Sequence, residues 1–262
     1  MSDVDNLPDR DFLLTLAKGL SVIELFGNQP RAMTQAEVAQ KAGLTKAAAR
    51  RILLTLEELG YLESQGRKFE LRPRVLRLGY SYLAAQGWLE IAQPHLDRLT
   101  ADLNECSSLA MIDTPDIVLL ARAVVRRIMS IALNTGVRLP AIHTSQGRVL
   151  LAFAPEEERE RILEISDYSA LTPNTITDPA RIRAMIDAVR ERRFSIADGE
   201  VDINMRAISV PVYSPNGRVI YSLSVSTQAE RHDRASLEAM APRMFETAQE
   251  LSDILRAFDR QG

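Results

Sequence analysis

The chain has 262 residues, of which 46% are hydrophobic and 26% charged, and its formal net charge at pH 7 is -3. This composition excludes disordered and fibrous proteins, and the length favours two domains because domains average about 150 residues. No apolar run approaches the roughly 20 residues that span a bilayer, so we expect no membrane partner.

The start of the chain is acidic and polar, unlike a signal peptide, and we therefore expect the protein in the cytoplasm. The single cysteine, Cys106, cannot form an internal disulfide. We expect this cysteine to be buried and chemically inert.

Positive charge is concentrated between Lys41 and Arg77. This segment contains nine basic and four acidic residues and so carries +5, which leaves -8 for the rest of the chain. A basic region in an acidic protein is typical of a surface that binds phosphate, although a solvated helix face gives the same count.

The beginning of the chain carries the signals of three helices. Apolar residues recur at helical spacing over residues 11–26. In the sequence TQAE, Thr34 can accept a hydrogen bond from an early helix amide while Glu37 bonds back to the Thr34 amide, which is a capping box. Thr45 can cap a third helix, which we expect to end at Gly60.

The third predicted helix has one apolar stripe and one basic face. Leu54 lies off the apolar stripe, and the sequence offers no explanation for it. The stripe that we expect to be buried contains Ala49, Ile52, Leu53, Leu56 and Leu59.

A hairpin follows these helices, because residues 61–71 alternate in polarity on either side of Gly66. Three helices and a hairpin indicate a winged helix-turn-helix domain over residues 1–72, with the third helix in the DNA major groove and the hairpin as its wing. A solvated charged face on a three-helix core is the alternative. The residues that we expect to contact DNA are Thr34, Thr45, Lys46, Ala47, Arg50, Arg51, Arg67 and Lys68.

The remaining residues predict a linker and a second domain. Pro73 suits the first turn of a helix, and we assign residues 73–87 to a linker helix. Mixed strands and helices over residues 88–262 indicate an α+β domain, a sheet backed by helices with one face open for a pocket. Strands are predicted at 107–113, 117–125, 127–133, 194–198, 207–214 and 218–226, and helices at 155–165, 178–193 and 233–258.

Over essentially its whole length the chain resembles the IclR-type transcriptional regulators. The matching pieces are TQAEVAQKAGLTKAAARRILLTLEELGYL, GVRLPAIHTSQGRVLLAF, DGE at residues 198–200 and AISVPVYSPNGRVIYSLSVS. The longer piece ARAVVRRIMSIALNTGVRLPAIHTSQGRVLLAF is similar to the subgroup that controls aromatic-acid catabolism through the β-ketoadipate route. The resemblance implies a GAF-like effector-binding domain after the winged helix, and a homodimer or dimer of dimers on DNA.

The resemblance also implies an effector pocket. Its expected lining is Ser145, Gln146 and Gly147 at the loop that opens a helix, Asp198 of the DGE segment, and Ser224 and Ser226 of the last strand. Amide groups at a helix start suit a carboxylate, which agrees with a small acid as ligand. The alternative is that the two serines are ordinary strand residues and that Asp198 caps a turn.

Three further residues are candidates for contact with an acidic effector. Arg126 is expected on a strand where consecutive arginines alternate faces, so that one of them points inward, and Arg138 lies in the same segment. His143 stands beside the helix-opening loop, although a lone histidine is more often a structural residue.

The sequence argues against an enzyme. HTSQG around Ser145 lacks the first glycine of the nucleophile elbow of hydrolases, because position 143 is histidine. His95, His143 and His232 are far apart and show no metal-ligand spacing, and no glycine-rich phosphate loop is present, so we expect no cofactor.

We therefore expect an effector-responsive transcription factor that binds a palindromic DNA operator and a small aromatic or dicarboxylic acid. The alternatives are a winged-helix module for protein interaction and oligomerisation and, as the weaker one, a hydrolase that uses Ser145.

Overall fold

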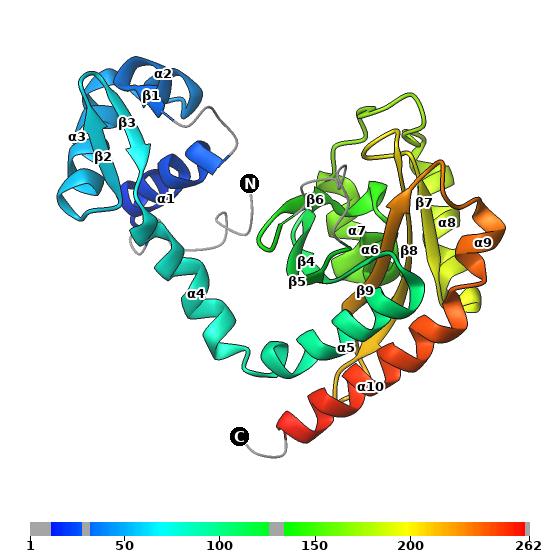
Figure 1. The fold of residues 1–262 in the computed structure, drawn as a ribbon. Helices are drawn as coiled ribbons and strands as arrows, with labels where there is room; N and C mark the ends of the chain where they lie inside the picture. Colours follow the sequence, from blue (N-terminus) through cyan, green and yellow to red (C-terminus); the bar gives the residue numbers. More distant parts are fainter. Residues whose placement is uncertain (1–11, 28–31, 126–133, 260–262) are drawn as a thin grey trace. The chain divides into compact units, whose positions relative to one another are not determined.

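The computed structural model describes residues 12–27, 32–125 and 134–259, which belong to two compact units, Met1–Ala85 and Gln86–Gly262 (Figure 1). Each unit has its own sheet and its own core. The predicted strand at 127–133 lies entirely outside the described residues.

The first unit is a winged helix-turn-helix fold, as predicted. A strand that the sequence did not predict, β1, pairs with the hairpin, and Gly66 makes the hairpin turn with a φ of 66°. The unit contains helices α1 (Leu14–Gly27), α2 (Gln35–Lys41) and α3 (Lys46–Glu58), strands β1 (Ala32–Thr34), β2 (Leu62–Gln65) and β3 (Lys68–Leu71), the 3-10 turn η2 (Pro73–Val75) and helix α4 (Leu76–Ala85).

Both predicted helix caps are present. The Thr34 hydroxyl accepts a hydrogen bond from the Glu37 amide at 3.3 Å, and the Thr34 amide donates to the Glu37 carboxylate at 2.7 Å. At the start of α3, the Thr45 hydroxyl accepts from the Ala48 amide at 3.2 Å. These caps fix where α2 and α3 begin, and α3 begins at the first basic residue of the predicted DNA-binding face.

The predicted apolar stripe of α3 is confirmed except at its end. Ala49, Ile52, Leu53 and Leu56 are buried, whereas Leu59 is 49% exposed. The prediction for Leu59 was wrong because the helix ends at Glu58, and Leu59 lines an open apolar groove beside α1 instead of the core.

The second unit is built on one antiparallel sheet of six strands in the order β6-β5-β4-β9-β8-β7. The last two strands in sequence, β8 and β9, pair over nine residue positions and form the middle of the unit with β4. The strands are β4 (Cys106–Asp113), β5 (Asp116–Ala123), β6 (Arg138–Pro140), β7 (Ser195–Asp198), β8 (Met205–Tyr213) and β9 (Val219–Gln228).

Helices cover both faces of this sheet (Figure 1). Helix α5 (Trp88–Leu103) packs against α10 (Ala241–Asp259) and lies on one face, where the Ser107 hydroxyl donates to the Leu96 carbonyl of α5 at 3.0 Å. Helix α6 (Ser145–Phe153) packs on β8 and β9 from the other face and carries α8 (Pro179–Arg192). The remaining helices are the turn η3 (Ala141–His143), α7 (Glu156–Ile165) and α9 (Arg234–Glu238).

Two sequence-based expectations need correction in this unit. The predicted helix at 233–258 is two helices, because α9 ends at Glu238 and α10 begins at Ala241. Cys106 is only half-buried rather than fully buried, because it is the first residue of β4 and lies near the end of the sheet.

Gly147 allows α6 to approach the turn η3 at backbone contact distance. A Cβ atom built on Gly147 would lie 2.1 Å from the carbonyl oxygen of Ala141 and 2.5 Å from its Cα. The contacting atoms are backbone and cannot rotate away, so any side chain at this position displaces the helix from the turn.

We therefore expect Gly147→Ala to lower the free energy of unfolding of the second unit by about 1–3 kcal/mol, the usual cost of overpacking a core. Gly79→Ala in α4 is the matched control, because its Cβ meets nothing within 4 Å, and we expect it to be neutral or stabilising by up to about 1 kcal/mol. Urea unfolding followed by circular dichroism measures both. Equal stabilities of the two variants would contradict the close approach.

Candidate ligand pocket and nucleic-acid interface

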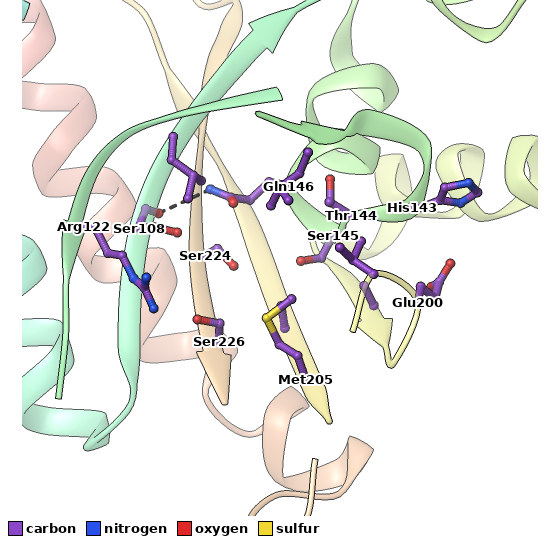
Figure 2. A pocket seen from close by; sticks show the side chains of 15 residues that line it. Ser108, Arg122, His143, Thr144, Ser145, Gln146, Glu200, Met205, Ser224 and Ser226 are labelled. Carbon is purple, nitrogen blue, oxygen red and sulfur yellow. Dashed lines mark hydrogen bonds between the residues drawn. The ribbon is translucent and has the colours of Figure 1, made fainter. Parts of the chain in front are cut away.

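A small cavity lies between α6 and the sheet of the second unit (Figure 2). Its volume is about 40 Å³, enough for about three water molecules at roughly 10–15 Å³ each. The side chains that line it come from all six strands, from η3 and α6, and from the turn after β7. They are Ser108, Leu119, Arg122, Leu139, His143, Thr144, Ser145, Gln146, Ala197, Glu200, Val201, Met205, Ala207, Ser224 and Ser226.

A row of serines crosses the sheet beneath α6, and two of them, Ser108 and Ser224, line the floor of the cavity. In the strand registers, Arg122 pairs with Ser108, Ser108 with Ser224, Ser224 with Ser209, and Ser209 with Ser195. Residues directly opposite one another in neighbouring strands point to the same face of a sheet. Because serine is small, this row leaves space beneath α6, and the guanidinium of Arg122 stands at one end of it.

The roof of the cavity is the start of α6, and its side chains are hydrogen-bonded to the floor. The Thr144 hydroxyl caps the helix by accepting from the Gly147 amide at 3.0 Å. The hydroxyls of Ser145 and Ser209 are 2.7 Å apart, and the Gln146 amide nitrogen donates to the Ser222 carbonyl at 3.1 Å. The roof and the floor are therefore joined by Ser145 and Gln146, two side chains that the sequence analysis had predicted to bind the effector.

A buried ion pair that the sequence analysis missed holds the wall of the cavity. The Arg148 side chain is fully buried, and it donates from Nε to the Ile142 carbonyl at 2.9 Å and from its two terminal nitrogens to the two carboxylate oxygens of Glu200. The Thr175 hydroxyl donates to the Glu200 carbonyl at 2.6 Å. The only signal in the sequence was one arginine within the otherwise apolar helix RVLLAF.

His143 lies beside this ion pair. Its side chain is fully buried, and neither ring nitrogen has a hydrogen-bond partner within the described residues. Burial lowers the pKa of His143, and the Arg148 charge lowers it further against the opposing charges of Glu200 and Asp167. Figure 2 shows the imidazole on the side of Glu200, away from Ser224 and Ser226, so His143 belongs to the wall behind the roof.

Three other predicted ligand residues, among those that the structure describes, do not line the cavity. Asp198 accepts a hydrogen bond from Arg206 Nε at 2.6 Å on the outer side of β7. Arg138 is paired with Asp113 and Asp116 at the far end of the sheet. Gly147 packs on η3, and Arg126 lies outside the described residues.

Five of the predicted ligand residues line the cavity; they are Ser145, Gln146, Ser224, Ser226 and His143. Ten lining residues were not among the predicted ligand residues; they are Ser108, Leu119, Arg122, Leu139, Thr144, Ala197, Glu200, Val201, Met205 and Ala207. Only the strand registers bring Ser108 and Arg122 next to Ser224, and a single sequence does not reveal those registers.

The first unit carries a basic surface on α3 and the hairpin. Lys46, Ala47, Arg50 and Arg51 are exposed on α3, and so are Arg67 and Lys68 at the hairpin turn. The hydroxyls of Thr34 and Thr45 are engaged in the helix caps.

Glu57, at the acidic end of α3, binds the hairpin. Its carboxylate accepts a hydrogen bond from the Ser64 amide at 3.1 Å and so attaches the hairpin to α3. The hairpin and the basic half of the helix are thereby held in one arrangement.

The described part of the chain contains no group of three or more histidine, cysteine, aspartate or glutamate side chains that could hold a metal ion. None of its helices is both long enough and apolar enough to cross a membrane.

Comparison with known proteins gives a family for both units. Residues 15–66 match the IclR helix-turn-helix domain, and residues 80–253 match the C-terminal domain of the bacterial transcriptional regulators of the IclR type.

Individual relatives match most of the chain. The Pca regulon regulatory protein of Pseudomonas putida is 40% identical over 231 residues, which are 88% of this chain and 79% of that protein. The p-hydroxybenzoate hydroxylase transcriptional activator of Acinetobacter baylyi is 32% identical over 96% of this chain and 95% of its own length. The crystal structure of an IclR homologue from Microbacterium hydrocarbonoxydans in complex with 4-hydroxybenzoate superposes with a TM-score of 0.77 at 27% identity, covering 93% of this chain and 99% of that one.

The lowered pKa of His143 predicts a pH-dependent stability. The unfolded chain takes up a proton on this residue near its ordinary pKa of about 6.5, whereas the folded chain does not. The unfolded state then binds more protons, so the free energy of unfolding falls as the pH drops below about 6.5. We expect His143→Leu to flatten this decline in urea unfolding at pH 7.5, 6.5 and 5.5. Parallel pH profiles of wild type and His143→Leu would contradict the assignment.

Proposed function

This chain belongs to the IclR family of bacterial transcriptional regulators, and we propose that it controls genes of aromatic-acid breakdown in response to a small aromatic acid. It is an effector-responsive regulator and not an enzyme. The main evidence that the effector is a small acid is the pocket, in which one arginine lies at the end of a row of serine hydroxyls. The Pca and p-hydroxybenzoate regulators among its relatives support the same class.

The lining of the pocket favours a monocarboxylic acid over a dicarboxylic one. Arg122 can pair with a carboxylate, and the hydroxyls of Ser108 and Ser226 lie at the same end (Figure 2). Among the described lining residues no second cation is available, because burial keeps His143 neutral. The second carboxylate of a dicarboxylic acid would therefore be buried without a countercharge.

Apolar side chains complete a site for a ring. Leu119, Leu139 and Ala207 line the cavity together with Met205, whose flexible thioether can repack around a flat ligand. Because the cavity holds only about three waters, we infer that an aromatic effector enters by displacing water and side chains at the Met205 end.

Removing the charge of Arg122 tests the effector site. We expect Arg122→Leu to weaken binding of 4-hydroxybenzoate by about 1.5–3 kcal/mol, the contribution of a hydrogen bond to a charged group, and to abolish the preference for 4-hydroxybenzoate over 4-hydroxybenzamide. Isothermal titration calorimetry measures both ligands. Arg206→Leu is the matched control, since its side chain pairs with Asp198 outside the pocket. An unchanged preference in Arg122→Leu would place the carboxylate elsewhere.

For the DNA partner, we propose that α3 enters the major groove of an operator and that the hairpin contacts the backbone. The exposed basic residues of α3 and the hairpin support this assignment, as does the match to the IclR helix-turn-helix domain. Bacterial DNA lies in the cytoplasm, which is where we expect the protein to act.

Arg51 is the residue that tests the recognition helix. We expect Arg51→Ala to weaken binding to the selected operator by about 1–3 kcal/mol, while effector binding and folding stay unchanged. Fluorescence anisotropy at fixed salt measures the affinity. Arg256→Ala, which removes an exposed arginine of α10, is the control and should bind as wild type. Unchanged operator affinity in Arg51→Ala would contradict the assignment of α3, and salt-insensitive binding by wild type would favour a protein-interaction module.

We further propose that the first unit pairs with a second copy of itself on a palindromic operator. An apolar groove of about 570 Å³ runs between α1 and α3. The groove is lined in part by Leu16, Leu20, Leu59 and Leu78, which are 59%, 46%, 49% and 47% exposed. Exposed apolar side chains in such number are typical of an interface, and a symmetric pair of recognition helices matches two half-sites.

A charge in the groove tests this pairing. We expect Leu16→Glu to shift the protein toward smaller species in sedimentation velocity and to weaken operator binding, because a buried carboxylate without a partner opposes association. Leu171→Glu, at a position that is 50% exposed in the second unit, is the control. An unchanged sedimentation coefficient and operator affinity in Leu16→Glu would exclude the groove as the interface.

A further inference from the structure

Leu54 of α3 is an exposed apolar side chain that neither the core nor the groove explains. It is 42% exposed, whereas Ile52, Leu53 and Leu56 of the same helix are at most 8% exposed. It is absent from the core of the first unit and from the lining of the groove beside α1. Leu54 therefore points away from both apolar regions that α3 contacts.

The position of Leu54 places it among the basic residues of the helix. It follows Ala47 by seven positions, Arg50 by four and Arg51 by three, and residues at these spacings share one helix face. All four residues are exposed. The face that they form is opposite the buried stripe of Ala49, Leu53 and Leu56.

The charge around Leu54 favours nucleic acid as the molecule that covers it. Arg50 and Arg51 lie one turn before it on the helix, and Arg67 and Lys68 on the hairpin add to the same basic surface. In the major groove of DNA, the one apolar group on the base edges is the 5-methyl group of thymine. The thymine methyl group is therefore the base-edge group that best matches a leucine between arginines in that groove.

We propose that Leu54 contacts the 5-methyl group of a thymine in each operator half-site and is a specificity-determining residue. The inference rests on the proposed role of α3 as the recognition helix. In that role the arginines pair with phosphates and with guanine, Ala47 leaves room for the backbone to approach, and Leu54 selects a T·A base pair at one position.

The experiment replaces thymine with deoxyuridine, which removes only the methyl group. Binding sites are first selected from a random duplex library with the full-length wild-type protein, and each thymine of the selected site is then changed to deoxyuridine. Fluorescence anisotropy at fixed salt gives the dissociation constants. For wild type, we expect one thymine per half-site at which deoxyuridine weakens binding about fourfold, which corresponds to about 0.8 kcal/mol for one buried methyl group.

The variant Leu54→Ala decides whether Leu54 makes that contact. We expect this variant to bind the thymine and deoxyuridine duplexes equally at that position and to keep the discrimination of wild type at every other position. Leu171→Ala, an exposed leucine of the second unit, is the control and should behave as wild type throughout. Thermal unfolding by circular dichroism should be the same for all three proteins because both leucines are exposed.

Three results would overturn the inference. Wild type could show no methyl dependence at any thymine, or Leu54→Ala could retain the full methyl dependence. Leu54→Ala could also change the sedimentation coefficient and leave the methyl dependence in place, in which case Leu54 contacts a protein. Failure of wild type to select any sequence is distinguishable from these three, because it would reject the proposed DNA-binding function itself.

Discussion

The buried ion pair between Arg148 and Glu200 is the interaction on which the ligand pocket depends. Arg148 lies on α6, and Glu200 lies in the turn after β7, which residues 172–175 bind through the hydroxyls of Thr172 and Thr175. Breaking a buried pair by removing one partner costs about 3–5 kcal/mol, because the other charge is left without compensation. The pair therefore fixes the distance between the roof of the pocket and its side wall.

The space between roof and floor follows from the alternation of side chains along the strands. In β4 and β9, Ser108 and Ser224 face α6, whereas the neighbouring residues Leu109 and Leu223 face α5 and α10 and are fully buried. Large apolar side chains thus fill one face of the sheet, and small hydroxyl side chains leave a cavity on the other. The same strands that make the core also make the binding site, and a single residue shift in register would exchange the two faces.

Local signals accounted for what could be predicted from the sequence. The caps at Thr34 and Thr45 and the hairpin turn at Gly66 depend on residues within a few positions of one another, and they were predicted correctly. The short strands β1 and β6 were not predicted. Leu59 and the closing helix were predicted wrongly because helix ends depend on what the chain packs against after the periodic pattern stops.

Most of the lining residues that were predicted came from the family motifs. Ser145, Gln146, Ser224 and Ser226 came from the family resemblance, and they line the cavity. Arg122 was missed because its place beside Ser108 depends on pairing between strands, and Arg148 was missed because its partner is 52 residues away. Contacts of this range leave no periodic pattern in one sequence.

The small size of the cavity bears on how an effector can act. A ligand shifts a conformational equilibrium only by the difference between its affinities for the two states. An aromatic acid exceeds the room of about three waters, and its binding must move side chains against bonds that already join roof and floor, such as the Ser145–Ser209 contact of 2.7 Å. The Ser145–Ser209 bond ties α6 to β8, so a ligand that separates these two side chains acts on the position of α6 relative to the sheet. We propose this displacement as the route by which an effector changes the spacing of paired DNA-binding units.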